Sequence, residues 1–198
     1  MILAVTGGIA SGKSAFSHAL AAIQPFVCFD ADAFVHELLS LNQSVISEIR
    51  AAFGDRALAP DGTIDRHALR SRVFADVEAR KRLETIIHPR VHRRWQQLRS
   101  ECLAEGRDFL ADIPLLFEVG AQECFDASVV VGASPSVQLE RLSGRGLTRE
   151  QAQAMIASQW PLADKLALAT VVVWNDGCHP RLEHQAALLA LRLGLPQR

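Results

Sequence analysis

A glycine-rich stretch near the start of the chain has the residue types that bind a phosphate chain. The stretch TGGIASGKS, from Thr6 to Ser14, satisfies the pattern G-x-x-x-x-G-K-[ST]. In such a loop, backbone N–H groups and the positive end of the next helix surround the phosphates, the lysine reaches the β- and γ-phosphates, and the hydroxyl residue binds Mg²⁺. A chance glycine-rich turn is disfavoured, because an apolar run precedes the loop and a helical pattern follows it. The predicted contacts are Gly8, Ile9, Ala10, Ser11, Gly12, Lys13, Ser14 and Ala15, with Ser14 as the metal ligand.

Two carboxylates, Asp30 and Asp32, follow the second apolar run of the chain. Open α/β sheets bind ligands at the carboxyl ends of their strands, and a carboxylate there can accept the proton of an attacking hydroxyl group. This favours a kinase over a hydrolase, with Asp32 as the base. Asp30 has three candidate roles: it orients Asp32, binds Mg²⁺ through water, or caps a helix that begins at Ala33. For Asp32 too, helix capping is the alternative to a catalytic role. No guanine-reading N-K-x-D sequence is present, which favours ATP.

A basic segment, RLSGRGLTRE, lies between two predicted helices and places Arg141 four residues before Arg145. Arginines that fold over a triphosphate stabilise the charge of the moving phosphoryl group and exclude water. The segment is therefore predicted to be a lid. An equally weighted alternative is a solvated helix end whose arginines interact favourably with the helix dipole.

Five apolar runs are predicted to form the strands that position these residues: 1–5, 26–29, 109–113, 128–132 and 170–173. Each run is continuous rather than alternating, as in strands covered on both faces. Helical patterns separate the strands, which predicts a parallel α/β sheet. Ser134 followed by proline and Thr148 followed by Gln151 are predicted helix starts, and Gly106 is a predicted helix end.

A long helical stretch, about 33–106, is too long for a simple crossover and is predicted to form a subdomain beside the sheet. It contains His88 and His92, four residues apart, a spacing that two metal ligands could share. The structural interpretation is favoured, because no Glu follows His88 and Pro89 is expected to begin a second helix.

The composition is typical of a globular protein: 198 residues, 49% of them apolar and 22% charged, with a formal net charge of -1. This balance argues against bulk nucleic-acid binding. Four widely spaced cysteines without a CxxC pair predict reduced thiols in a cytoplasmic protein. No apolar run approaches the roughly 18 residues of a membrane helix.

The motifs taken together resemble the dephospho-coenzyme A kinase family, which phosphorylates the ribose 3′-hydroxyl of dephospho-CoA in the last step of CoA synthesis. The resemblance covers nearly the whole chain. It rests on LAVTGGIASGKS at 3–14, FDADAFVHEL at 29–38, DGTIDRHALRSRVF at 61–74, IIHPRV at 86–91 and DIPLLFE at 112–118, and on the spaced Gln138, Arg141, Arg145, Gln159 and Asn175.

The resemblance implies one P-loop kinase domain over 1–198, with a five-stranded parallel sheet of the nucleoside-monophosphate-kinase type. Its parts would be a nucleotide core at about 1–32 and 107–198, a helical CoA-binding insertion at about 33–106 and a lid at about 141–165. ATP and Mg²⁺ would be the cofactors and dephospho-CoA the substrate, with no obligate protein partner. The implied catalytic residues are Asp32, Lys13 and Arg141; Arg145 and Asn175 would join the loop in binding ATP, and Asp30, Asp32, His36 and Leu115 would contact the substrate.

Some positions depart from the family pattern. Ala10 stands where many members have Gly, and His36 where many have Arg. Asp112 is a candidate for a water-mediated Mg²⁺ contact, Leu115 could instead close the core, and Glu118 is a candidate local anchor. Two other functions stay open at this point: another hydroxyl kinase for nucleosides or nucleotides, and a switch that hydrolyses a nucleotide to change shape.

Overall fold

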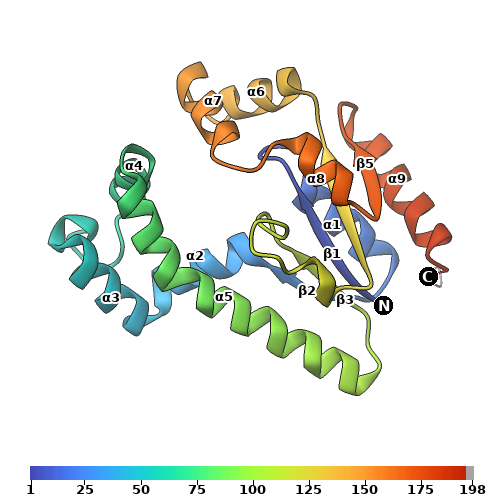
Figure 1. Cartoon of the computed structure of the whole chain (residues 1–198), viewed down its shortest axis with the longest axis horizontal. Coiled ribbons are helices and arrows are strands. Elements are labelled where there is room, and N and C mark those ends of the chain that lie inside the picture. The colour runs from blue at the N-terminus through green and yellow to red at the C-terminus, as the bar shows by residue number, and fades with distance from the viewer. Residues whose placement is uncertain (195–198) are drawn as a thin grey trace. The chain divides into compact units, whose positions relative to one another are not determined.

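A parallel sheet of five strands forms the centre of the unit made of Met1–Asp30 and the described chain from Leu98 onward (Figure 1). The computed structural model describes residues 1–194, except for the side chains of Phe74 and Ala75. The strand order is β2-β3-β1-β4-β5, and every pairing is parallel. The predicted five-stranded α/β sheet is therefore confirmed. The strands are β1 Ile2–Gly7, β2 Val27–Asp30, β3 Phe109–Asp112, β4 Ala127–Gly132 and β5 Val171–Trp174.

The chain divides into two compact units, and each is described by itself. The first comprises Met1–Asp30 and the described chain from Leu98 onward, and the second comprises Ala31–Gln97. In the first unit, apolar side chains on one face of the sheet pack against two helices, α1 and α9. Besides the end of α5 (Val77–Glu105), its helices are α1 Lys13–Ile23, α6 Pro135–Ser143, α7 Arg149–Ala157, α8 Leu162–Leu168 and α9 His179–Arg192, with a short 3-10 helix at Gln122–Cys124.

The second unit is helical and has an apolar core of its own. Its buried residues include Val45, Ile49 and Phe53 on one face of α3. Spacings of four residues place such side chains one above another, which explains the amphipathic pattern of the sequence. The unit contains α2 Ala31–Leu41, α3 Gln43–Phe53, a 3-10 helix at Asp55–Ala57, α4 Arg66–Ala75 and most of α5 Val77–Glu105.

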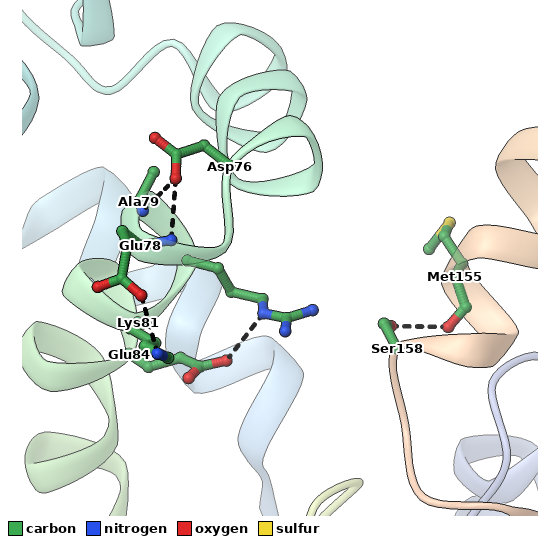
Figure 2. Close-up of polar contacts among 8 residues, drawn as sticks. Asp76, Glu78, Ala79, Lys81, Glu84, Met155 and Ser158 are labelled. Carbon is green, nitrogen blue, oxygen red and sulfur yellow. Dashed lines mark hydrogen bonds and ion pairs between the residues drawn. The ribbon is translucent and has the colours of Figure 1, made fainter.

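Local capping residues fix the ends of several helices. Ser134 accepts a hydrogen bond from the Val137 amide at the start of α6, and Thr148 forms a capping box with Gln151 at the start of α7. The Asp76 side chain accepts two amide hydrogen bonds in the first turn of α5 (Figure 2). Gly106 adopts a φ of 64° after α5, a left-handed conformation in which glycine has no Cβ penalty. The predicted starts at Ser134 and Thr148 and the predicted end at Gly106 are confirmed.

Two predicted helix starts are wrong. Pro89 lies inside α5 instead of beginning a new helix. It has no N–H to donate to the Thr85 carbonyl one turn earlier, but the adjacent Ile86 and Ile87 side chains are buried in the core of the second unit, which favours a continuous helix despite the lost hydrogen bond. Helix α2 begins at Ala31 and not at Ala33, so Asp32 lies in its first turn. No helix in the described part of the chain is both long and apolar enough to cross a membrane.

Candidate active site

The phosphate loop connects β1 to α1, and glycine is required at its two ends. Gly7 has a φ of 154°, and a Cβ there would lie 2.1 Å from the Val131 carbonyl oxygen. Gly12 has a φ of 94°, and a Cβ there would lie 2.3 Å from Nδ2 of Asn175. Both contacts are shorter than any Cβ can tolerate. The glycine pattern of the sequence therefore reflects close approach of the loop to β4 and to the residue after β5.

Three side chains from outside the loop bind its carbonyl groups. Gln138 Nε2 donates to the Ile9 carbonyl at 2.7 Å. Arg141 Nη1 donates to the carbonyls of Ala10 and Ser11 at 3.0 and 3.1 Å, and Asn175 Nδ2 donates to the Ser11 carbonyl at 2.8 Å. Backbone carbonyls repel phosphate oxygens, whereas N–H groups attract them. Because these carbonyls are bonded to donors that come from outside the loop, the contacts stabilise the observed loop conformation.

Ala10 is the one residue other than glycine in the described chain with a positive φ, at 55°. A left-handed conformation places Cβ close to the next carbonyl oxygen and costs an L-residue roughly 1–2 kcal/mol, whereas glycine adopts it freely. A glycine at this position would therefore adopt the loop conformation without that cost. The departure noted in the sequence leaves the loop shape intact and adds local strain.

Asp112, at the end of β3, contacts the two polar side chains that begin α1. Ser14 Oγ donates a 2.8 Å hydrogen bond to Asp112 Oδ2, and Lys13 Nζ lies 3.8 Å from Oδ1. The Asp112 carboxylate is only 4% exposed. Parallel pairing aligns Asp112 with Val5, two residues before the end of β1, and with Asp30 at the end of β2. Sheet register therefore brings carboxylates to the start of α1.

A small recess beside α1 includes three side chains with oxygen atoms suited to a hard cation, Ser14, Asp30 and Asp112. The rest of its lining includes the apolar side chains of Phe29 and Leu110. Among the described residues no three His, Cys, Asp or Glu side chains converge to hold a metal ion. Mg²⁺ usually keeps several waters and binds one or two protein oxygens plus substrate phosphates, so this sparse oxygen set fits Mg²⁺.

The structure brings most of the predicted nucleotide ligands together, because the loop, Arg141 and Asn175 are joined by hydrogen bonds. Arg145 is exposed in the turn between α6 and α7. Asp32 and His36 are exposed on α2 of the second unit, four residues apart and so on one helix face. Leu115 is half-buried in the loop that follows β3. The roles of these four residues stay predictions.

Sequence reasoning missed a buried lysine close to the loop after β3. Lys165, on α8, is fully buried, and its Nζ lies 2.7 Å from Glu118 Oε1 and 2.9 Å from the Pro114 carbonyl oxygen. Thr6, just before the phosphate loop, donates to the same Pro114 carbonyl at 3.1 Å. The only sequence signal was Glu118, which we interpreted as a local anchor. A lysine in a helical pattern is expected on the solvated face.

A phosphate loop between the first strand and first helix of a parallel sheet, with Arg141 and Asn175 bound to its carbonyl groups, defines a P-loop nucleotide-binding protein. The family model described as dephospho-CoA kinase matches residues 1–180. The chain belongs to the dephospho-CoA kinase family, whose reaction is the final step of CoA biosynthesis. Its members are kinases that use ATP to phosphorylate dephospho-CoA.

Individual relatives agree with this assignment. The dephospho-CoA kinase of Anaeromyxobacter dehalogenans is 42% identical over 187 residues, covering 93% of this chain and 88% of that protein. The Methylococcus capsulatus enzyme is 37% identical and covers 98% of both chains. Among solved structures, a Thermus thermophilus protein has a TM-score of 0.79 at 30% identity, covering 99% of this chain and 98% of its own. The Campylobacter jejuni dephospho-CoA kinase has a TM-score of 0.64 at 25% identity, covering 97% and 96%.

Proposed function

We propose that the chain transfers the γ-phosphoryl group of Mg²⁺-bound ATP in line to the ribose 3′-hydroxyl of dephospho-CoA, giving CoA and ADP. The observation that carries the proposal is the contact of Lys13 and Ser14 with Asp112 at the carboxyl end of β3. This arrangement places a cation for the phosphates, a hydroxyl for the metal and a carboxylate within a few ångströms of one another. Phosphoryl transfer depends mainly on such positioning and charge stabilisation.

Each side chain has a defined task in this proposal. Lys13 binds the β- and γ-phosphates, while the loop amides hold the phosphate chain. Ser14 would bind the metal directly, with Asp112 and Asp30 orienting its waters. Bound Mg²⁺ supplies positive charge that offsets the negative charge of the phosphates.

The residues proposed to act on dephospho-CoA, the phosphoryl acceptor, belong to the second unit. Asp32 accepts the proton of the 3′-hydroxyl as this group attacks, and His36 contacts the substrate from the same face of α2. Arg145 folds over the triphosphate from the turn after α6. Arg141 is proposed to contribute charge to the same step, and its guanidinium also binds main-chain carbonyls of the loop and of Asn175.

A product assay tests the proposal. The protein is mixed with ATP, Mg²⁺ and dephospho-CoA, and the products are separated and identified by mass. The expected result is equal amounts of CoA and ADP. ADP without CoA would instead identify a nucleotide-hydrolysing switch, and phosphorylation of nucleosides in a parallel panel would identify another hydroxyl kinase. The family assignment favours neither alternative.

A further inference from the structure

Two side chains of α6 bind the phosphate loop on either side of its strained residue. Gln138 donates to the carbonyl that precedes Ala10, and Arg141 donates to the carbonyl of Ala10 itself. Gln138 is 4% exposed, and its amide nitrogen would lie 2.6 Å from a Cβ placed on Gly8. Its side chain therefore fits closely against the loop.

These contacts oppose the conformation that Ala10 would otherwise prefer. An alanine relaxes to negative φ unless its surroundings prevent it, and such a change rotates the two peptide units that flank it. Rotation would move the carbonyls of Ile9 and Ala10 away from their donors. It would also redirect the N–H group of Ala10, in a loop whose N–H groups bind phosphate, and would break the 3.2 Å hydrogen bond from the Ser11 N–H group to the Gly8 carbonyl.

We propose that Gln138 is a positioning residue for nucleotide binding. Together with Arg141, its amide holds Ala10 in the left-handed conformation and so keeps the loop N–H groups directed at the phosphates of ATP. Gln138 itself has no contact with the phosphates in this proposal. The proposal rests on the ATP-dependent transfer described above, and it assigns a purpose to a buried polar side chain that the reaction does not otherwise use.

The test replaces Gln138 by Met, which has a similar length but no hydrogen-bond donor. Loss of one neutral hydrogen bond corresponds to a factor of about 5 to 10, so the KM for ATP is expected to rise about 5- to 10-fold. The KM for dephospho-CoA should stay within about twofold, because the loop does not bind it. Gln24→Met is the matched control, since Gln24 is also 4% exposed and donates to Asp108 Oδ2 at 2.7 Å, at the end of the sheet opposite the loop.

A second substitution separates positioning from simple loss of packing. Glycine adopts positive φ as readily as negative φ, so Ala10→Gly in the Gln138→Met background should recover most of the lost affinity for ATP. If the Gln138→Met protein does not fold, Ala10→Val alone still tests the idea. A β-branched residue strongly disfavours positive φ, and this variant should weaken ATP binding with Gln138 intact.

Three outcomes would overturn the proposal. They are an unchanged KM for ATP despite a lower Tm, an equal rise in the KM of both substrates, and failure of Ala10→Gly to restore binding. Calorimetric titration of ATP into the same variants gives an independent readout. If the wild-type protein bound ATP but formed no CoA, the transfer reaction would be wrong, while the titrations would still decide the role of Gln138.

Discussion

The hydroxyl of Ser14 and the carboxylate of Asp112 are joined by a 2.8 Å hydrogen bond across the start of α1. The proposed metal ligand, Ser14 at the start of α1, is thus oriented by a buried carboxylate at the end of β3. Partners that orient a metal ligand typically contribute a factor of 10 to 100 in metal affinity or activity. Without Asp112, the hydroxyl would be free to rotate and Lys13 would lose a nearby negative charge.

Asp112→Asn is therefore expected to raise the Mg²⁺ concentration needed for half-maximal CoA formation by about 10- to 100-fold. The measurement is initial rate against Mg²⁺ at saturating ATP and dephospho-CoA. Asp108→Asn is a suitable control, because Asp108 lies just before the opposite end of β3, where it contacts the N-terminal amine. An unchanged Mg²⁺ dependence in Asp112→Asn would contradict a metal-orienting role.

Asp32→Asn tests the proposed base. General-base catalysis contributes about 10²- to 10⁴-fold, so kcat should fall by that factor while the Kd for ATP stays unchanged. Steady-state rates and ATP titration on the same preparation measure both quantities. Glu37→Gln, another exposed carboxylate on α2, should retain wild-type kcat. Near wild-type turnover of Asp32→Asn would show that another group is the general base or that the reaction needs no base.

The sequence predicted the strands and the phosphate loop because their signals are local. Five continuous apolar runs are sufficient to locate buried parallel strands, and the spacing of glycine, lysine and serine defines the loop. The caps at Ser134 and Thr148 were likewise predictable, since each depends on residues within one helical turn.

The parts that were missed depend on contacts between residues distant in the chain. Lys165 is buried only because α8 packs where Glu118 and the Pro114 carbonyl can bind its ammonium group. Gln138 was noted as part of the resemblance, but its hydrogen bond to Ile9 spans 129 positions and has no sequence signature. Pro89 was misinterpreted because the rule that proline ends a helix does not consider tertiary packing, here the burial of Ile86 and Ile87 in the turn that precedes the proline.

The buried pair of Lys165 and Glu118 makes a prediction about stability. Removing one partner of a buried ion pair leaves an uncompensated charge and typically costs about 3–5 kcal/mol, so Lys165→Met should lower the free energy of unfolding by about that amount. Glu118→Gln in the same background should recover part of the loss, because it removes the isolated charge. Urea denaturation monitored by circular dichroism provides the comparison.

An exposed pair on α5 is the matched control for Lys165. Lys81 Nζ lies 2.8 Å from Glu78 Oε1, a similar distance, but both side chains are more than half exposed (Figure 2). Exposed pairs contribute about 0–1 kcal/mol, so Lys81→Met should change the free energy of unfolding very little. Equal effects of the two lysine substitutions would show that burial of Lys165 does not determine its contribution.

The final prediction concerns acid sensitivity at the edge of the sheet. Burial alone would raise the pKa of Asp108, but hydrogen bonds from the N-terminal amine and from Gln24 outweigh burial and leave the pKa below its ordinary value. A carboxylate whose pKa is lowered by folding stabilises the native state above its unfolded pKa, and this stabilisation is lost as the pH falls through the folded pKa. Asp108→Asn should therefore destabilise the protein at about pH 7 and have a smaller effect at about pH 3, where Asp108 in the unfolded chain is mostly protonated. Urea unfolding of both proteins at the two pH values measures the difference. A constant difference between them would mean that the charge of Asp108 does not contribute.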